Sequence, residues 1–218
     1  MATTAASNWT ARQVGRVKPF FFLLMLYPLG RWLWLGYAGG LTANPPEFLI
    51  RSSGIWALVA LLITLAITPL RRLVGQPALV RLRRMAGLFS FFYTCLHLFG
   101  WALWERGLSL AAMWQDTVQR TFITVGMVAF VMLLPLALTS THGWMRRLGP
   151  LWQRLHRSVY LIAALSVWHF WLVRAGKNDF VEPYTYGAVL AVLLALRLVY
   201  VIRRRLATAA AAPVRVVP

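Results

Sequence analysis

The chain has 218 residues, of which 60% are hydrophobic and only 13% are charged, and its mean hydropathy is +0.64. A soluble domain of this size needs more polar surface than that, so the composition excludes an ordinary soluble enzyme and predicts a membrane protein. The single cysteine, Cys95, excludes an intramolecular disulfide and any iron–sulfur site built from cysteines.

Six apolar segments are long enough, or nearly so, to cross a bilayer as helices, which takes about 20 residues each. In chain order they are 19–37, 54–69, 85–104, 121–139, 158–173 and 184–202. The connections are short, so neighbouring helices are expected to run antiparallel. We therefore predict an all-α integral membrane protein, with a six-helix transmembrane bundle over 19–202 between an N-terminal tail (1–18) and a basic tail (203–218). No internal repeat is evident.

The charged residues predict the orientation of this bundle. The two tails and the connections after the second and fourth segments hold 16 of the 23 basic residues and no acid, and all four lie on one side of a six-span protein. The opposite side holds all five acids, which are Glu47, Glu105, Asp116, Asp179 and Glu182. The positive-inside rule then places both termini in the cytoplasm. The basic loops are expected to contact anionic lipid headgroups, so the charge of +18 requires no nucleic acid as a partner.

Two histidines lie inside predicted spans at a similar depth. His97 follows Arg84 by 13 residues and His169 follows Arg157 by 12, so both lie about 18–20 Å into a hydrocarbon core about 30 Å thick. A histidine inside a span is a candidate functional residue, although one that only hydrogen-bonds a neighbouring helix would look the same in the sequence. Two imidazoles at one level are what a six-coordinate heme iron needs, so His97 and His169 are predicted heme ligands.

Other ionisable residues are weaker candidates. His156 precedes His169 by 13 residues, a rise of about 19.5 Å along a straight helix, and would serve a second redox site or lie in a basic surface loop. The two side chains would be about 140° apart around that helix, so either the fifth span starts irregularly or they address different neighbours. His142 is expected to be solvated or to face the headgroups, with a spare ligand as the alternative. Arg31 and Arg197 lie within spans, where each would either snorkel to the interface or bind a heme propionate.

These residues stand within two groups of short motifs. The first group is ITPL at 67–70, QP at 76–77, RLRR at 81–84, GL at 87–88 and LHL at 96–98. The second is LTST at 138–141, RLG at 147–149, WQRLH at 152–156, VYL at 159–161 and His169. In combination, over nearly the whole chain, they resemble the MsrQ family (formerly YedZ). These are the heme-binding membrane subunits of periplasmic methionine-sulfoxide reductase systems, within the ferric-reductase-like transmembrane group.

The resemblance implies a multi-pass protein of the bacterial inner membrane that carries electrons through b-type heme, with His97, His156 and His169 as the family's histidines. It also implies flavin mononucleotide (FMN), although the sequence contains no Gly-rich phosphate loop. Electrons would come from the quinone pool or a cytoplasmic flavin reductase. They would go to the periplasmic molybdenum enzyme MsrP, which reduces methionine sulfoxide in oxidised proteins. The wider group usually has four histidine ligands on two helices, and this chain lacks the fourth.

A transporter that binds protons or metal ions with its histidines is the competing interpretation. No acidic residue lies within a predicted span, however, and neither an inverted repeat nor a pair of broken helices is evident. A self-sufficient reductase is disfavoured because the chain lacks a nucleotide-binding domain. We therefore expect an electron-transfer subunit whose partner carries out the final reduction.

Overall fold

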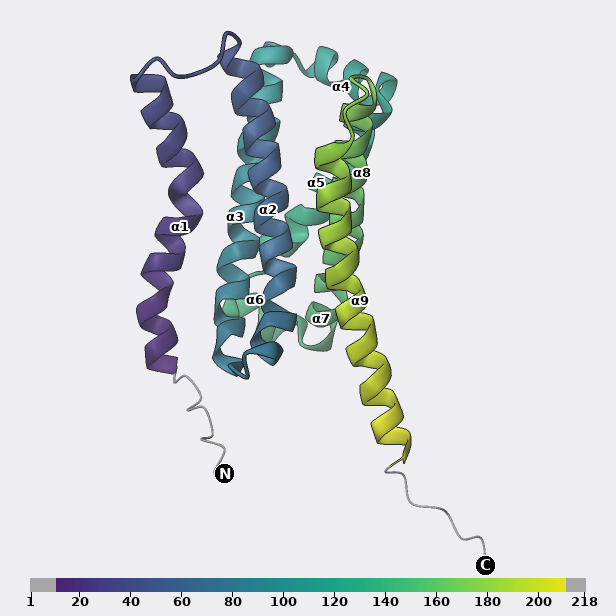
Figure 1. The fold of residues 1–218 in the computed structure, drawn as a ribbon. Coiled ribbons are helices and arrows are strands. Elements are labelled where there is room, and N and C mark those ends of the chain that lie inside the picture. The colour runs from purple at the N-terminus through teal and green to yellow at the C-terminus, as the bar shows by residue number, and fades with distance from the viewer. Residues whose placement is uncertain (1–10, 211–218) are drawn as a thin grey trace, which may run out of the picture.

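The computed structural model describes residues 11–210, which form helices joined by short turns, without strands (Figure 1). Six of these helices are long and apolar enough to cross a membrane. The candidate spans are α1 (Ala11–Tyr37), α2 (Pro45–Leu73), α3 (Val80–Gly100) with its flanking turns, α5 (Thr121–Leu138), α8 (Val159–Ala175) together with the short helix before it, and α9 (Val181–Ala210). The prediction of an all-α protein with six membrane-spanning helices is confirmed.

Several helices extend beyond the apolar segments that predicted them. Helix α2 begins at Pro45, because the Asn44 side chain accepts a hydrogen bond from the Glu47 backbone N–H and proline suits the first helical position. Residues 11–18 and 203–210, predicted as parts of the tails, continue α1 and α9 as helix. The rest of both predicted tails lies outside the described residues. Hydropathy marks the lipid-facing part of a helix, whereas capping decides where the helix ends.

Three short helices lie at the two ends of the bundle (Figure 1). Helix α4 (Leu110–Gln119) lies at the end where α2 begins and α3 finishes; this end carries all five acidic residues, and we call it the carboxylate end. Helices α6 (His142–Leu148) and α7 (Pro150–His156) lie at the opposite end, which we call the arginine end. Helix α1 starts and α9 finishes at the arginine end.

Packing divides the bundle into two helical hairpins, α2–α3 and α5–α8. Helix α2 is central, with 56% of its apolar window buried, whereas α9 is peripheral, with 6% buried. Leu58 of α2, Leu133 of α5 and Ile162 of α8 belong to one buried cluster that joins the two hairpins. Helix α1 is attached separately, in part through a 2.5 Å hydrogen bond from the buried Tyr93 hydroxyl to the Met25 carbonyl. The two hairpins therefore face each other, and the candidate site lies between them.

Candidate functional site

A cavity of about 360 Å³ lies between the two hairpins, toward the carboxylate end. It is lined by His97 of α3 and His169 of α8, whose rings have centroids 6.1 Å apart and planes at 80°. The sequence predicted that these two residues share a depth and face each other, and the structure brings them together. The remaining lining is mostly apolar and comes from α2, α3, α5 and α8.

Both imidazoles are held in the same way, by a backbone carbonyl of the partner helix. The Nδ1 atom of His97 lies 2.8 Å from the Ile50 carbonyl oxygen, and that of His169 lies 2.6 Å from the Phe122 carbonyl oxygen. Because a carbonyl can only accept, each Nδ1 must carry the proton and donate it. In the neutral ring Nε2 is then free to bind a metal, and this second hydrogen bond fixes the ring orientation, as is usual for metal-ligating histidines.

A glycine makes room for each ring. A Cβ atom on Gly54 would come within 2.9 Å of the His97 ring, and one on Gly126 would come within 2.9 Å of the His169 ring. Each glycine follows the accepting carbonyl by four residues, so it lies on the same face of its helix one turn further on. The sequence analysis missed both glycines, because an isolated glycine in an apolar helix shows its purpose only when the neighbouring helix is known.

The two hairpins are internal repeats of each other around the cavity. The histidine follows its accepting carbonyl by 47 residues in both hairpins. Four residues of the first hairpin have a counterpart 72 positions later in the second: Ile50 with Phe122, Gly54 with Gly126, Thr94 with Ser166 and His97 with His169. The hydroxyls of Thr94 and Ser166 each donate to the carbonyl four residues earlier at 2.8 Å. The repeat escaped sequence inspection because it is confined to residues that contact the cavity.

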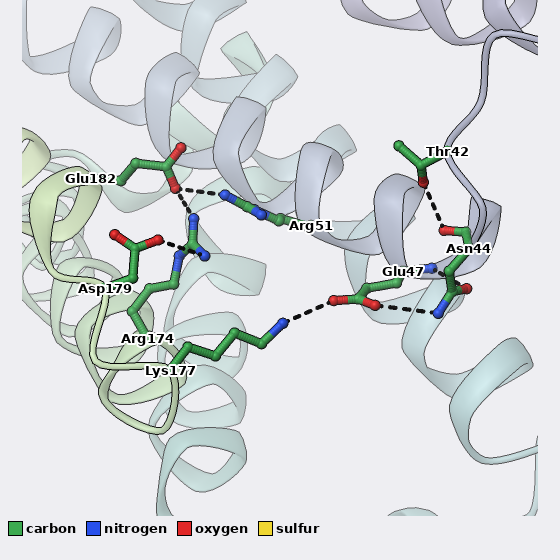
Figure 2. A network of polar contacts seen from close by, with 8 residues as sticks. All are labelled: Thr42, Asn44, Glu47, Arg51, Arg174, Lys177, Asp179 and Glu182. Atoms are coloured by element: carbon green, nitrogen blue, oxygen red, sulfur yellow. Dashed lines mark hydrogen bonds and ion pairs between the residues drawn. The ribbon is translucent and has the colours of Figure 1, made fainter.

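Ion pairs join the helices at the carboxylate end (Figure 2). Arg174 is only 5% exposed and forms ion pairs with Asp179, at 3.1 Å, and with Glu182. Glu182 also pairs with Arg51 of α2 at 3.0 Å. Arg51 and Arg174 both line the cavity. This network therefore ties α2, α8 and the start of α9 together over its mouth.

Helix α4 is attached to the same mouth through one buried carboxylate. Asp116 pairs with Arg106 at 2.7 Å and with Arg120 at 2.8 Å, and it accepts a 3.3 Å hydrogen bond from the Trp101 indole N–H. Trp101, Arg106 and Arg120 all line the cavity. Asp116 thus carries the ion pairs of both Arg106 and Arg120, and Glu105 lines the same part of the cavity.

His156 lies apart from the histidine pair, at the end of α7. Its ring stacks on Trp152 at 3.9 Å, its Nδ1 lies 3.1 Å from the Trp152 carbonyl oxygen, and its buried Nε2 has no hydrogen-bond partner among residues 11–210. The helix breaks between α7 and α8 just after His156, so the fifth span does start irregularly. The counterpart 72 positions earlier is Arg84, so the repeat supplies no second histidine here.

The remaining predicted contacts do not line the histidine cavity. The Arg31 guanidinium lies 5.8 Å from the ring centre of Phe48, and that of Arg197 lies 4.7 Å from the ring centre of Tyr160. His142 is exposed at the first position of α6. The cations that line the cavity lie outside the predicted apolar segments, where hydropathy offers no signal.

The spacing of the two imidazoles matches that of two ligands on one metal ion. A metal–imidazole bond is about 2.0–2.1 Å long, and each nitrogen lies about 1.1 Å from its ring centre. Two imidazoles on one metal ion therefore have ring centres about 6.2–6.4 Å apart, close to the 6.1 Å between His97 and His169. Residues 11–210 contain no cluster of three or more His, Cys, Asp or Glu side chains that would hold a bare metal ion. Two imidazoles alone would leave most coordination positions of a bare metal ion open. The iron of a heme already carries four porphyrin nitrogens, so two imidazoles are enough to complete its coordination.

The chain was compared with known proteins. The family model described as ferric reductase like transmembrane component matches residues 53–167. The protein-methionine-sulfoxide reductase heme-binding subunit MsrQ of Bordetella pertussis is 58% identical over 92% of this chain and 97% of its own length. The proteins of the same name from Ralstonia nicotianae and Herminiimonas arsenicoxydans are 51% and 47% identical, over 86% and 88% of this chain and 87% and 89% of their own lengths. No solved structure matches the chain.

Glu182→Gln should destabilise the protein, because it leaves the buried Arg174 and the nearby Arg51 short of one negative charge. The Glu182 side chain is 40% exposed, so we expect a loss of about 1–3 kcal/mol, measured by reversible unfolding in detergent. The matched control is Glu47→Gln, whose exposed pair with Lys177 at 3.1 Å should contribute only about 0–1 kcal/mol. Equal losses in the two variants would show that the Arg174 network does not stabilise the bundle.

Proposed function

The chain belongs to the MsrQ family of ferric-reductase-like membrane proteins, and we propose that it carries electrons across the bacterial inner membrane to a periplasmic methionine-sulfoxide reductase. The observation that carries this proposal is the pair of imidazoles 6.1 Å apart, each with Nδ1 directed to a carbonyl and Nε2 left for a ligand. Relatives that carry heme-binding in their names support the same assignment.

His97 and His169 are the residues that would hold a b-type heme, which when bound would supply a carrier for one electron at a time. The two carbonyl hydrogen bonds hold the rings, and the apolar lining of the cavity keeps water from them. Heme propionates require cations at the edge of the hydrocarbon. Arg106 and Arg120, which share Asp116 as their only carboxylate among the ion pairs of residues 11–210, are better placed for this role than Arg31 or Arg197.

The proposed orientation places the arginine end in the cytoplasm and the carboxylate end in the periplasm, as the positive-inside rule requires. Electrons then enter from the quinone pool or a cytoplasmic flavin reductase. They leave at the carboxylate end to the molybdenum enzyme MsrP, which reduces methionine sulfoxide in oxidised periplasmic proteins. The described residues are occupied by the helical bundle, so the terminal reduction belongs to the partner.

A second cofactor is proposed at the arginine end, beside His156. Its buried Nε2 has no partner among the described residues, and a buried polar atom left in that state is costly. A cofactor that interacts with this nitrogen, by a hydrogen bond or through a metal, would remove that cost. Family resemblance favours FMN, and a heme with His156 as its only protein ligand is the alternative.

His97→Ala or His169→Ala should abolish the b-type absorption spectrum of the purified protein, because either change removes one of the two axial ligands. A pyridine-hemochrome assay would measure the heme bound per chain. His142→Ala is the matched control, since His142 is exposed on α6 and remote from the cavity. Full heme content in both cavity variants would contradict the assignment.

Gly126→Ala should weaken heme binding roughly tenfold or more, because the new methyl group displaces the His169 ring from its carbonyl and supporting contacts of this kind typically govern 10–100-fold in affinity. Heme titration of the heme-free protein gives the affinity, and the midpoint potential reports the altered ligand. Gly87→Ala provides the control, since its Cβ would meet only Thr64 at an ordinary 3.7 Å. An unchanged affinity for Gly126→Ala would show that the glycine does not set the ring position.

His156→Ala should leave the heme between His97 and His169 in place and remove the cofactor at the arginine end. Heme and flavin would be quantified in the same sample. Loss of flavin identifies FMN beside His156, and loss of one heme equivalent identifies a second heme. Retention of both at wild-type levels would eliminate His156 as a cofactor residue.

A further inference from the structure

A second hollow, of about 850 Å³, lies at the arginine end and is separate from the histidine cavity. It is bounded by the end of α2, the start of α8 and the last turns of α9. Five arginines line it, which are Arg72, Arg157, Arg197, Arg204 and Arg205. Arg197 is partly buried and the other four are exposed, so solvent screens part of their mutual repulsion, and an anion bound among them would relieve the rest.

The protein itself supplies no aspartate or glutamate to balance these arginines. All five acidic residues of the sequence lie at the carboxylate end, on the far side of the membrane-spanning part. Two of the arginines contact aromatic rings instead. The Arg72 Cζ atom lies 3.3 Å from the ring centre of Tyr200, and the Arg197 Cζ atom lies 4.7 Å from the ring centre of Tyr160. Cation–π contacts orient a guanidinium group but do not neutralise it, so its hydrogen-bond donors stay available to a ligand.

A buried hydroxyl in the same hollow also lacks a partner. Tyr160 lines the hollow, and its Oη is buried without a hydrogen-bond partner among residues 11–210. Buried hydroxyls in folded proteins are almost always hydrogen-bonded, so an unpaired one in a lined hollow indicates a missing acceptor. The hollow therefore offers several charged donors and one neutral donor, and it requires an acceptor with negative charge.

We propose that this hollow binds a phosphate ester. Phosphate accepts paired hydrogen bonds from guanidinium groups, and it carries enough charge and enough oxygen atoms to engage several arginines and a tyrosine at once. Tyr160 and Tyr200 provide aromatic surface for the organic part of the ligand. Two sources present this chemistry at a cytoplasmic membrane face: the headgroup of an anionic phospholipid, and the phosphate of a soluble mononucleotide such as FMN. The proposal depends on the arginine hollow and not on the heme assignment.

Binding would be tested on the full-length protein, freed of bound lipid by extensive detergent washing. Three probes would be titrated separately: short-chain phosphatidylglycerol, short-chain phosphatidylcholine and FMN. The variant Arg157→Gln/Arg204→Gln should weaken binding of the phosphate probe roughly tenfold or more, because it removes two sets of charge-assisted hydrogen bonds. Its matched control is Arg146→Gln/Arg154→Gln, which removes the same charge from exposed arginines at the same end and should change the affinity less than about twofold.

The outcomes separate the two sources. Preference for phosphatidylglycerol over phosphatidylcholine, lost in the hollow variant, identifies a lipid site, and variant-sensitive FMN binding identifies a mononucleotide site. Tyr160→Phe removes only one oxygen atom and should weaken the same probe several-fold, so it provides the test if the double variant fails to fold by circular dichroism. Equal affinities in the hollow variants and the control, for every probe, would overturn the proposal.

Discussion

The hydrogen bonds from two histidine Nδ1 atoms to backbone carbonyls are the interaction on which the site depends. Inside a membrane there is no water to accept an N–H, so each imidazole must find its acceptor within the protein. The Ile50 and Phe122 carbonyls already belong to continuous helices, but a carbonyl oxygen has two lone pairs and can accept a second bond. A glycine one turn along lets the ring come close enough to use it. Ring position, tautomer and helix packing are therefore parts of one arrangement.

Charge is treated differently at the two ends of the bundle. At the carboxylate end, the ion pairs of the buried Arg174 join α8 to the start of α9, and the Glu182–Arg51 pair extends this link to α2. The buried Asp116 of α4 pairs with Arg106 and Arg120, which flank that helix in the sequence. At the arginine end no acidic side chain is present, and the guanidinium groups contact tyrosine rings or remain exposed. One end thus carries its own counter-charges, whereas the other has no aspartate or glutamate to balance its arginines.

Residue depth could be read from the sequence, whereas helix rotation could not. The six spans follow from hydropathy, and the common depth of His97 and His169 follows from counting residues from Arg84 and Arg157. Gly54 and Gly126 could not be found in this way, because their role depends on which face each helix turns to its neighbour. Arg31 and Arg197 were selected because they interrupt apolar segments, but the cations that line the cavity lie outside those segments. Those positions are fixed only by tertiary packing.

The repeated hairpin also determines how a flat group would be held. In each hairpin the first helix carries the accepting carbonyl and the second helix carries the histidine, 47 residues later in both cases. The two rings therefore lie at the same level of the bundle. The ring centres lie 6.1 Å apart, so the two hairpins present their imidazoles to the same space. A flat group held by both rings would therefore meet the same supports from each hairpin: one imidazole, one accepting carbonyl and one glycine.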